Sequence, residues 1–185
     1  MSEDTRYLLW PDGLRPPDVD VPDGYALRTS KLTGRDREAV DALLDGGGQR
    51  NGVEAFRDRV LPNGSFVAVE RATNAVVGTC SALHDPNAGD HRFPFGGALA
   101  GLVVDPAHRR EGLGRALAAA ATRRLLDAGY DSVRVGVDAD RKPALVLALN
   151  AGYAPCVLED GDVGRWRDVF DRLGLPFDPD RCLRP

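Results

Sequence analysis

The sequence has few cysteines, few histidines and no long apolar run, and each shortage narrows the class of protein it can encode. Among 185 residues there are three cysteines, Cys80, Cys156 and Cys182, which form neither a CxxC pair nor a zinc-binding pattern. An odd number of widely spaced cysteines is typical of reduced thiols, so we expect a cytoplasmic protein. The three histidines and scattered carboxylates indicate no metal site.

Membrane and nucleic-acid signals are also missing. No apolar stretch approaches the roughly 20 residues that cross a bilayer, and the first residues, Met-Ser-Glu-Asp-Thr-Arg, are polar and unlike a signal peptide. The formal net charge of −4 argues against a protein that binds nucleic acid through a basic face. We therefore expect neither a membrane nor a nucleic acid as a partner. The length suits one domain with its own core.

One segment, residues 102–117, organises the chain. It opens with the β-branched and apolar pattern of a strand, which Asp105-Pro106 ends because proline cannot donate to a β-ladder. Basic residues around two glycines then lead into a helix rich in Ala and Leu. The first N–H groups of such a helix lack partners, its dipole favours negative charge, and glycines let a phosphate come close. The segment therefore predicts a strand, turn and helix that bind a diphosphate, with arginines as further donors.

Two common phosphate-binding motifs do not fit this turn. A P-loop needs four residues between its glycines and then Gly-Lys-Ser/Thr, whereas Gly112 and Gly114 are one residue apart and no lysine follows. A dinucleotide fingerprint needs Gly or Ala where Leu117 stands. The pattern Arg/Gln-x-x-Gly-x-Gly/Ala does fit, through Arg109, Gly112 and Gly114, and it resembles the acyl-CoA signature of the GCN5-related N-acetyltransferase (GNAT) family. An ordinary strand-to-helix turn with surface arginines is the alternative.

The rest of the chain predicts alternating elements around this segment. Residues 1–24 form an extended arm whose Leu8, Leu9 and Trp10 dock on the domain or on a partner, because the prolines that follow exclude a helix or central strand. Residues 25–174 form the domain, and 175–185 a tail. We expect strands at 25–29, 66–70, 76–83, 98–104, 132–137 and 153–158. We expect helices at 33–44, 53–61, 112–128, 143–151 and 163–173, and a loop at 85–97.

This order resembles the GNAT family over residues 25–158. A second motif agrees, because Gly152-Tyr153 after Ala144-Leu145-x-Leu147 is similar to the family's closing Ala-Leu-x-Leu-Tyr-x-x-x-Gly-Phe segment. The resemblance implies a mixed α/β (α+β) single domain, in which helices flank a central mixed β-sheet. It also implies that the sheet is splayed between the fourth and fifth strands, 98–104 and 132–137.

In that fold, acetyl-CoA would enter the splay as acyl donor. Its pantetheine would pair with main-chain groups of Leu102 and Val104, and its diphosphate would lie on the turn. Asp140 and Arg141 would face the same cleft. The resemblance thus implies one set of donor-binding residues: Leu102, Val103, Val104, Arg109, Arg110, Glu111, Gly112, Leu113, Gly114, Arg115 and Arg141.

The expected activity is acetyl-CoA-dependent N-acetyl transfer without a metal. A primary amine would attack the thioester directly in a ternary complex, with the Val104 N–H holding the oxyanion. The acceptor is a small-molecule amine or, as an alternative, a protein amine. The chain would act as a monomer or homodimer. A module that binds acyl-CoA but has lost its chemistry is a second hypothesis, and a structural role, in which the Trp10 arm or the Trp166 helix forms a dimer contact, is a third.

The sequence assigns no catalytic acid or base. The family's usual proton-donating tyrosine aligns with Ala148, which has no proton to give. Water, Cys156 or a loop side chain could take its place, since a thiolate with a pKa near 8.5 is a tolerable leaving group. The nearest candidates for a base are His84, Asp85, Asp90 and His91, although a solvated loop residue is the simpler interpretation of each.

Overall fold

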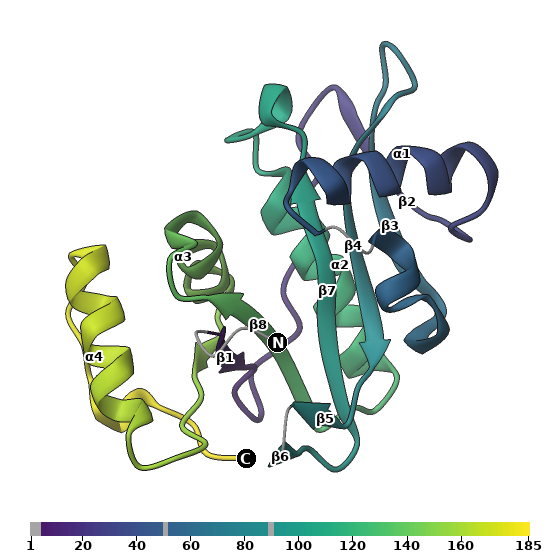
Figure 1. Cartoon of the computed structure of the whole chain (residues 1–185). Coiled ribbons are helices and arrows are strands. Elements are labelled where there is room, and N and C mark those ends of the chain that lie inside the picture. Colours follow the sequence, from purple (N-terminus) through teal and green to yellow (C-terminus); the bar gives the residue numbers. More distant parts are fainter. Residues whose placement is uncertain (1–4, 50–51, 89–90) are drawn as a thin grey trace.

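A seven-stranded mixed sheet runs through the computed structural model, which describes residues 5–49, 52–88 and 91–185 (Figure 1). The strand order is β2-β3-β4-β7-β8-β1-β9. β7 and β8 are parallel, and the other neighbours are antiparallel. The strands are β1 (Thr5–Leu9), β2 (Tyr25–Thr29), β3 (Val60–Glu70), β4 (Val76–His84), β7 (Gly96–Val104), β8 (Ser132–Asp138) and β9 (Ala154–Pro155). β5 (Asn87–Ala88) and β6 (His91–Arg92) form a separate small hairpin. The mixed α/β class is confirmed.

Helices cover both faces of this sheet. In Figure 1, α1 (Gly34–Gly46) crosses in front of β4 and β7, and α2 (Leu113–Asp127) lies behind them. α3 (Lys142–Ala151) and α4 (Asp162–Leu173) share the apolar core of α2. The sequence spaces Leu113, Leu117, Ala121 and Leu125 four residues apart, which predicts one apolar helix face. This prediction is confirmed, because all four residues are buried in that core. None of the helices described here is both long and apolar enough to cross a membrane.

The predicted helix at 53–61 is wrong. Two short 3₁₀ turns, η1 (Gly52–Ala55) and η2 (Arg57–Arg59), replace it, and β3 begins at Val60. Val53 and Phe56 are both buried, and a spacing of three residues suits a 3₁₀ turn as well as a helix. The long first part of β3 is irregular, because its register against β4 shifts between Val60 and Ser65.

The N-terminal segment differs from the expected arm. β1 lies inside the sheet, antiparallel to both β8 and β9. Leu8 and Leu9 are buried on opposite faces, and Trp10 packs edge-on against Tyr153 with ring centroids 5.2 Å apart. All four prolines that argued against a strand come after Leu9, so they do not interrupt it.

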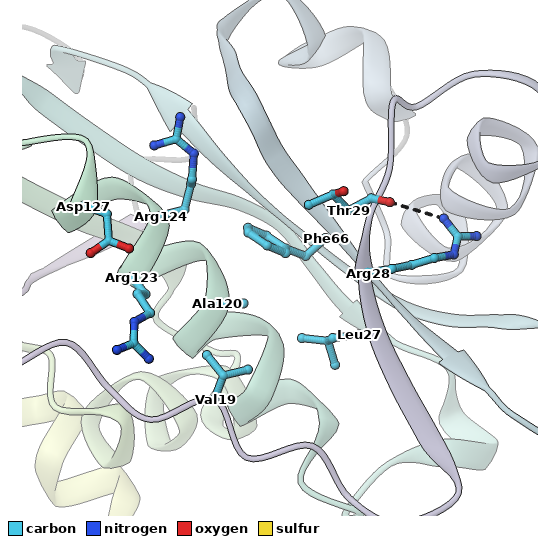
Figure 2. A pocket seen from close by; sticks show the side chains of 9 residues that line it. All are labelled: Val19, Leu27, Arg28, Thr29, Phe66, Ala120, Arg123, Arg124 and Asp127. Carbon is cyan, nitrogen blue, oxygen red and sulfur yellow. Dashed lines mark hydrogen bonds between the residues drawn. The ribbon is translucent and has the colours of Figure 1, made fainter.

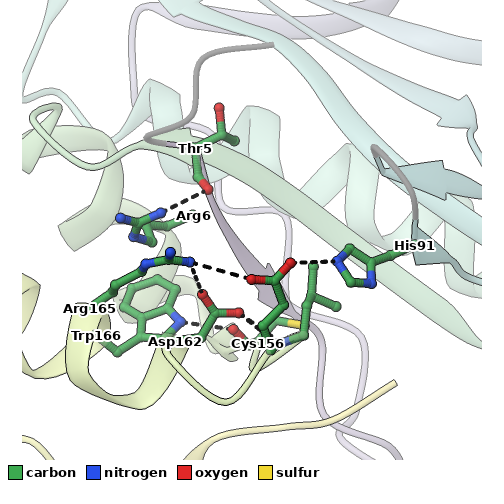
Figure 3. A network of polar contacts seen from close by, with 9 residues as sticks. Thr5, Arg6, His91, Cys156, Asp162, Arg165 and Trp166 are labelled. Carbon is green, nitrogen blue, oxygen red and sulfur yellow. Dashed lines mark hydrogen bonds and ion pairs between the residues drawn. The ribbon is translucent and has the colours of Figure 1, made fainter.

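The end of the chain also returns to the sheet. The predicted strand 153–158 is reduced to β9, where Pro155 has no N–H to donate, and Cys156 then forms a bridge with Leu183. The Asp162 carboxylate accepts hydrogen bonds from the Leu158 and Glu159 amides, and the Trp166 indole donates to the Cys156 carbonyl at 2.8 Å (Figure 3). These contacts fix α4 and the tail against β9.

The sheet splays where the sequence predicts it. The ladder between β7 and β8 runs only from the pair Gly96 and Ser132 to the pair Leu99 and Val135. Beyond Leu99, β7 stays paired with β4 and β8 stays paired with β1, so the two strands separate. This opening is the predicted gap between residues 98–104 and 132–137, and we refer to it as the cleft.

Candidate functional site

β7, which forms one wall of the cleft, contains a β-bulge. Its register against β4 shifts between the pair Ser81 and Ala100 and the pair Thr79 and Val103. Gly101 lies at this point with a φ of +63°, and a Cβ there would approach the Phe56 ring to 3.0 Å. Only glycine suits this position. We did not single out Gly101 from the sequence, although an isolated glycine inside a strand is a signal for a bulge.

Val104 directs its main chain into the cleft. The Asp105 amide donates to the Val77 carbonyl at 2.8 Å, so residues 77 and 105 form a hydrogen-bonded pair of the antiparallel ladder. Bonding alternates along such a ladder, so the N–H and C=O of Val104 point away from β4. Leu102, two residues earlier, has the same orientation. The Val104 carbonyl accepts a hydrogen bond from Arg109 Nε at 3.0 Å. This leaves the Val104 N–H facing the cleft.

The turn after β7 leads into α2, whose N-terminus has no side-chain cap. η3 (Pro106–His108) is capped by Asp105, whose carboxylate accepts from the Ala107 amide at 2.8 Å. Arg110 and Gly112 then adopt positive φ values of 67° and 90°. Gly112 is the N-cap of α2 and offers no side-chain bond, so the first amides of the helix have no partner in the described part of the chain. A helix start of this kind attracts anions.

The predicted arginines do not all lie together. Arg109, Arg110 and Arg115 belong to the turn and the first turn of α2, where all three are exposed. Arg110 and Arg115 make no ion pair with any residue described. Arg141 lies on the other side of the cleft, after β8, where its Nη2 donates to the Gly47 carbonyl at 3.0 Å. It therefore ties the loop after α1 to the start of α3.

Other predicted donor-binding residues have structural tasks. The Val103 and Leu113 side chains are buried, so each has only its main chain to offer a ligand. A Cβ on Gly114 would lie 2.7 Å from Leu147 Cδ1, so this glycine permits close contact between α2 and α3. The sequence motif indicates only the approach of a phosphate to Gly114 and not this helix contact. Glu111 is exposed, and its negative charge is unfavourable for contact with a phosphate.

The positions examined for a catalytic acid supply none. Ala148 is buried in the core between α2 and α3. Nearby, burial raises the pKa of Tyr153 far above its usual range, and its hydroxyl is bonded to Thr122 Oγ1 at 2.6 Å. Burial also raises the pKa of Cys156 to about 12, and this thiol packs with Leu9 and Phe93, beyond β8. Neither group can donate a proton in the cleft.

The candidate bases in the loop are engaged at the opposite end of β7. His84 Nδ1 contacts the Tyr130 hydroxyl at 3.0 Å, near the end of α2. Asp85 pairs with Arg134 at 3.0 Å and with Arg59 at 3.1 Å. His91 lies 3.7 Å from Glu159. Asp90 lies outside the described residues. These contacts do not favour any of them as the base.

Arg134 is a residue that the sequence pattern misrepresents. The alternation of Val133, Val135 and Val137 predicts an outward side chain, yet Arg134 is only 2% exposed. Its guanidinium donates to the carbonyls of Asp85 and Asn87 and lies 4.6 Å from the Phe93 ring centroid. These contacts hold the start of the 85–97 loop against β8. Its only sequence signal was one charge in an apolar strand.

A separate hollow of about 470 Å³ lies between α2 and the strands β2 and β3 (Figure 2). Leu27 and Phe66 form its apolar floor, and Arg123 stands at its rim. No residue of the turn or of the cleft lines it. The described residues also contain no cluster of three or more His, Cys, Asp or Glu side chains arranged to hold a metal ion.

Comparison with known proteins agrees with this geometry. The acetyltransferase (GNAT) family profile matches residues 37–153, which include the cleft and the turn. The chain belongs to the GNAT acetyltransferase family.

Curated relatives include the mycothiol acetyltransferases of Thermobifida fusca and Saccharomonospora viridis. Each is 31% identical to this chain; the first match covers 73% of this chain and 41% of the relative, the second 74% and 48%. The chain thus spans about half of these relatives or less.

Solved structures show the same fold. The GCN5-related N-acetyltransferase from Sphaerobacter thermophilus has a TM-score of 0.60 and 21% identity, over 82% of this chain and 48% of the other. The protein yncA from Salmonella typhimurium, solved with its cofactor acetyl-CoA, has a TM-score of 0.53 and 17% identity. That match covers 70% of this chain and 79% of yncA.

Proposed function

We propose that this chain is an acetyl-CoA-dependent N-acetyltransferase whose acceptor is a small-molecule amine. The observation that supports it is the splay of β7 from β8 directly beside the uncapped start of α2. An extended pantetheine arm can pair with the Val104 main chain as an added strand, while its diphosphate meets the free amides at Gly112 to Gly114.

The chemistry of this arrangement is direct transfer. The neutral amine nitrogen attacks the thioester carbonyl and forms the C–N bond of a tetrahedral intermediate. The C–S bond then breaks, CoA leaves as the thiolate, and the extra proton on the nitrogen passes to water. The Val104 N–H stabilises the negative oxygen of the tetrahedral intermediate. With no acid or base assigned in the cleft, most of the acceleration comes from holding the two substrates together, and the leaving thiolate takes its proton from water.

The names of the relatives support a small acceptor. Several are mycothiol acetyltransferases, and none of those named above is described as acting on a protein. The loops after α1 and before β7 border the two ends of β7 and are the regions where acceptor selectivity would reside. We therefore favour a small primary amine over a lysine or an N-terminus of a protein.

Calorimetric titration with acetyl-CoA tests the proposal, with S-acetylpantetheine, which lacks the nucleotide and its phosphates, as the matched ligand. Binding at micromolar acetyl-CoA and at least tenfold weaker binding of the truncated thioester are expected. Free thiol released over a panel of small amines would then identify the acceptor. No binding at millimolar acetyl-CoA contradicts the proposal, and binding without release over the whole panel favours the inactive module.

A further inference from the structure

Two residues far apart in the sequence meet beside the proposed donor site. Tyr25 is the first residue of the edge strand β2, and His108 is the last residue of η3 in the turn after β7. The Tyr25 hydroxyl lies 3.0 Å from His108 Nδ1, and the two rings pack edge to face with centroids 5.8 Å apart. A Cβ on Gly112 would approach Pro22 to 3.4 Å, so the segment before Tyr25 also packs against the turn.

This contact bears on which nitrogen of His108 serves as an outward donor. Burial, and then the charges of Glu111 and Glu70, raise the pKa of Tyr25, so the phenol keeps its proton at neutral pH. When the Tyr25 O–H donates to Nδ1 of the neutral imidazole, the ring hydrogen resides on Nε2, which is then the outward donor.

Nε2 of His108 is also free. It makes no hydrogen bond or ion pair with any residue that the structure describes, and the side chain is half-buried rather than fully solvated. The neighbouring residues Arg109 and Gly112 belong to the proposed diphosphate site. A fixed N–H donor beside the free amides of a helix start is suited to a phosphate oxygen.

We propose that His108 Nε2 is an additional ligand for a phosphate of the acyl donor, and that Tyr25 is the positioning residue that holds His108 for it. This inference rests on the proposed function. It adds a contact from the edge strand of the sheet to a site otherwise built from β7 and α2. The phosphate is either one of the diphosphate pair or the 3′-phosphate of the ribose.

The chain offers a matched control for this pair. His84 Nδ1 contacts the Tyr130 hydroxyl at the same 3.0 Å, but at the other end of α2. Tyr130→Phe removes a hydrogen bond of the same kind without touching the turn. Tyr25→Phe keeps the ring of Tyr25 and removes its hydroxyl. His108→Asn keeps a polar atom toward Tyr25 and removes Nε2.

The test is calorimetric titration of the full chain and these variants with CoA. His108→Asn should weaken CoA binding about tenfold, as expected for the loss of one hydrogen bond to a charged phosphate. Tyr25→Phe should weaken it about threefold to tenfold. Tyr130→Phe should bind CoA like the unmodified chain. In turnover, Tyr25→Phe should raise the KM for donor and leave kcat unchanged.

Truncated ligands distinguish the two phosphates. If His108 contacts the 3′-phosphate, His108→Asn will lose affinity for CoA and not for 3′-dephospho-CoA. If it contacts the diphosphate, both ligands will weaken equally. In either case binding of S-acetylpantetheine, which has no phosphate, should be the same with and without Nε2.

Failure of this inference is separable from failure of the proposed function. If the unmodified chain does not bind CoA, the proposed function and this inference both fall. If it binds CoA and His108→Asn binds CoA equally well, only the role of His108 is overturned. If His108→Asn weakens the binding of S-acetylpantetheine as much as the binding of CoA, the role of His108 is also overturned. That result would indicate a general distortion of the turn.

Discussion

The Arg141 guanidinium donates a hydrogen bond across the mouth of the cleft to the Gly47 carbonyl, with a distance of 3.0 Å between Nη2 and the oxygen. This bond joins the end of α1 to the start of α3, two elements that cover opposite faces of the sheet. Gly47 also packs against β7, because a Cβ at Gly47 would lie 2.9 Å from Val103 Cγ2. The loop after α1 is thus fitted to both walls of the cleft.

Substitution by alanine should have opposite effects on stability at Gly46, the last residue of α1, and at Gly47, the residue that follows it. Gly47→Ala forces the new methyl against Val103, so we expect a loss of about 1–3 kcal/mol in the free energy of unfolding. At Gly46 nothing lies within 4 Å of the added Cβ and φ is not positive. Gly46→Ala should therefore be neutral or stabilise by up to about 1 kcal/mol. Urea denaturation of both variants measures this, and equal effects would contradict the packing argument.

Gly114 should matter for the contact between helices as well as for donor binding. Gly114→Ala places a methyl 2.7 Å from Leu147 Cδ1, and we expect a destabilisation of about 1–3 kcal/mol. Leu147→Ala in the same chain makes room for that methyl. The double variant should consequently be more stable than the sum of the two single losses predicts, which denaturation of all four proteins measures. Simple additivity would show that Leu147 is not the obstacle.

Salt dependence should identify the cations that face the donor. Arg109→Ala is expected to weaken CoA binding about threefold to tenfold and to make the affinity less sensitive to salt, since one cation near the phosphates is gone. Arg123→Ala is the matched control, because Arg123 is an exposed arginine near the C-terminal end of α2, away from the turn, and has no ion pair among the residues described. Titrations with CoA at low and high salt check this prediction. It is contradicted if the affinity depends on salt concentration equally in both variants.

Asp162 should contribute stability that depends on pH. Burial alone would raise its pKa, but hydrogen bonds from the Leu158 and Glu159 amides and from Arg165 lower it below the usual value. A carboxyl whose folded pKa is lowered stabilises the fold above its unfolded pKa, near 4, and this stability is lost as pH falls through the folded pKa. Asp162→Asn should cost about 1 kcal/mol at pH 7 and at pH 5, and clearly less at pH 3.

Denaturation at these three pH values measures the effect for Asp162→Asn. Asp160→Asn is the control two residues away, because Asp160 is exposed and has no ion pair within the described ranges. A difference between Asp162→Asn and the unmodified chain that stays constant down to pH 3 would show that the carboxylate charge is not the source of the stability.

Local sequence patterns were sufficient for the turn and for α2. Asp105-Pro106 ends β7, α2 begins directly after Gly112, and the leucine stripe of α2 is buried, as the residues themselves predict. These features follow from dihedral preferences and from periodicity within a few residues. The position of the splay came from the family resemblance and is confirmed by the ladder between β7 and β8.

Only the tertiary structure decided which distant segments meet. β1 enters the sheet between β8 and β9, Arg134 is buried under the 85–97 loop, and Tyr25 reaches His108. No short-range pattern encodes these contacts, because β1 and Tyr25 reach their partners only after long loops close. The sequence by itself therefore determined the course of the turn between β7 and α2, and the packed sheet determined what holds that turn in place.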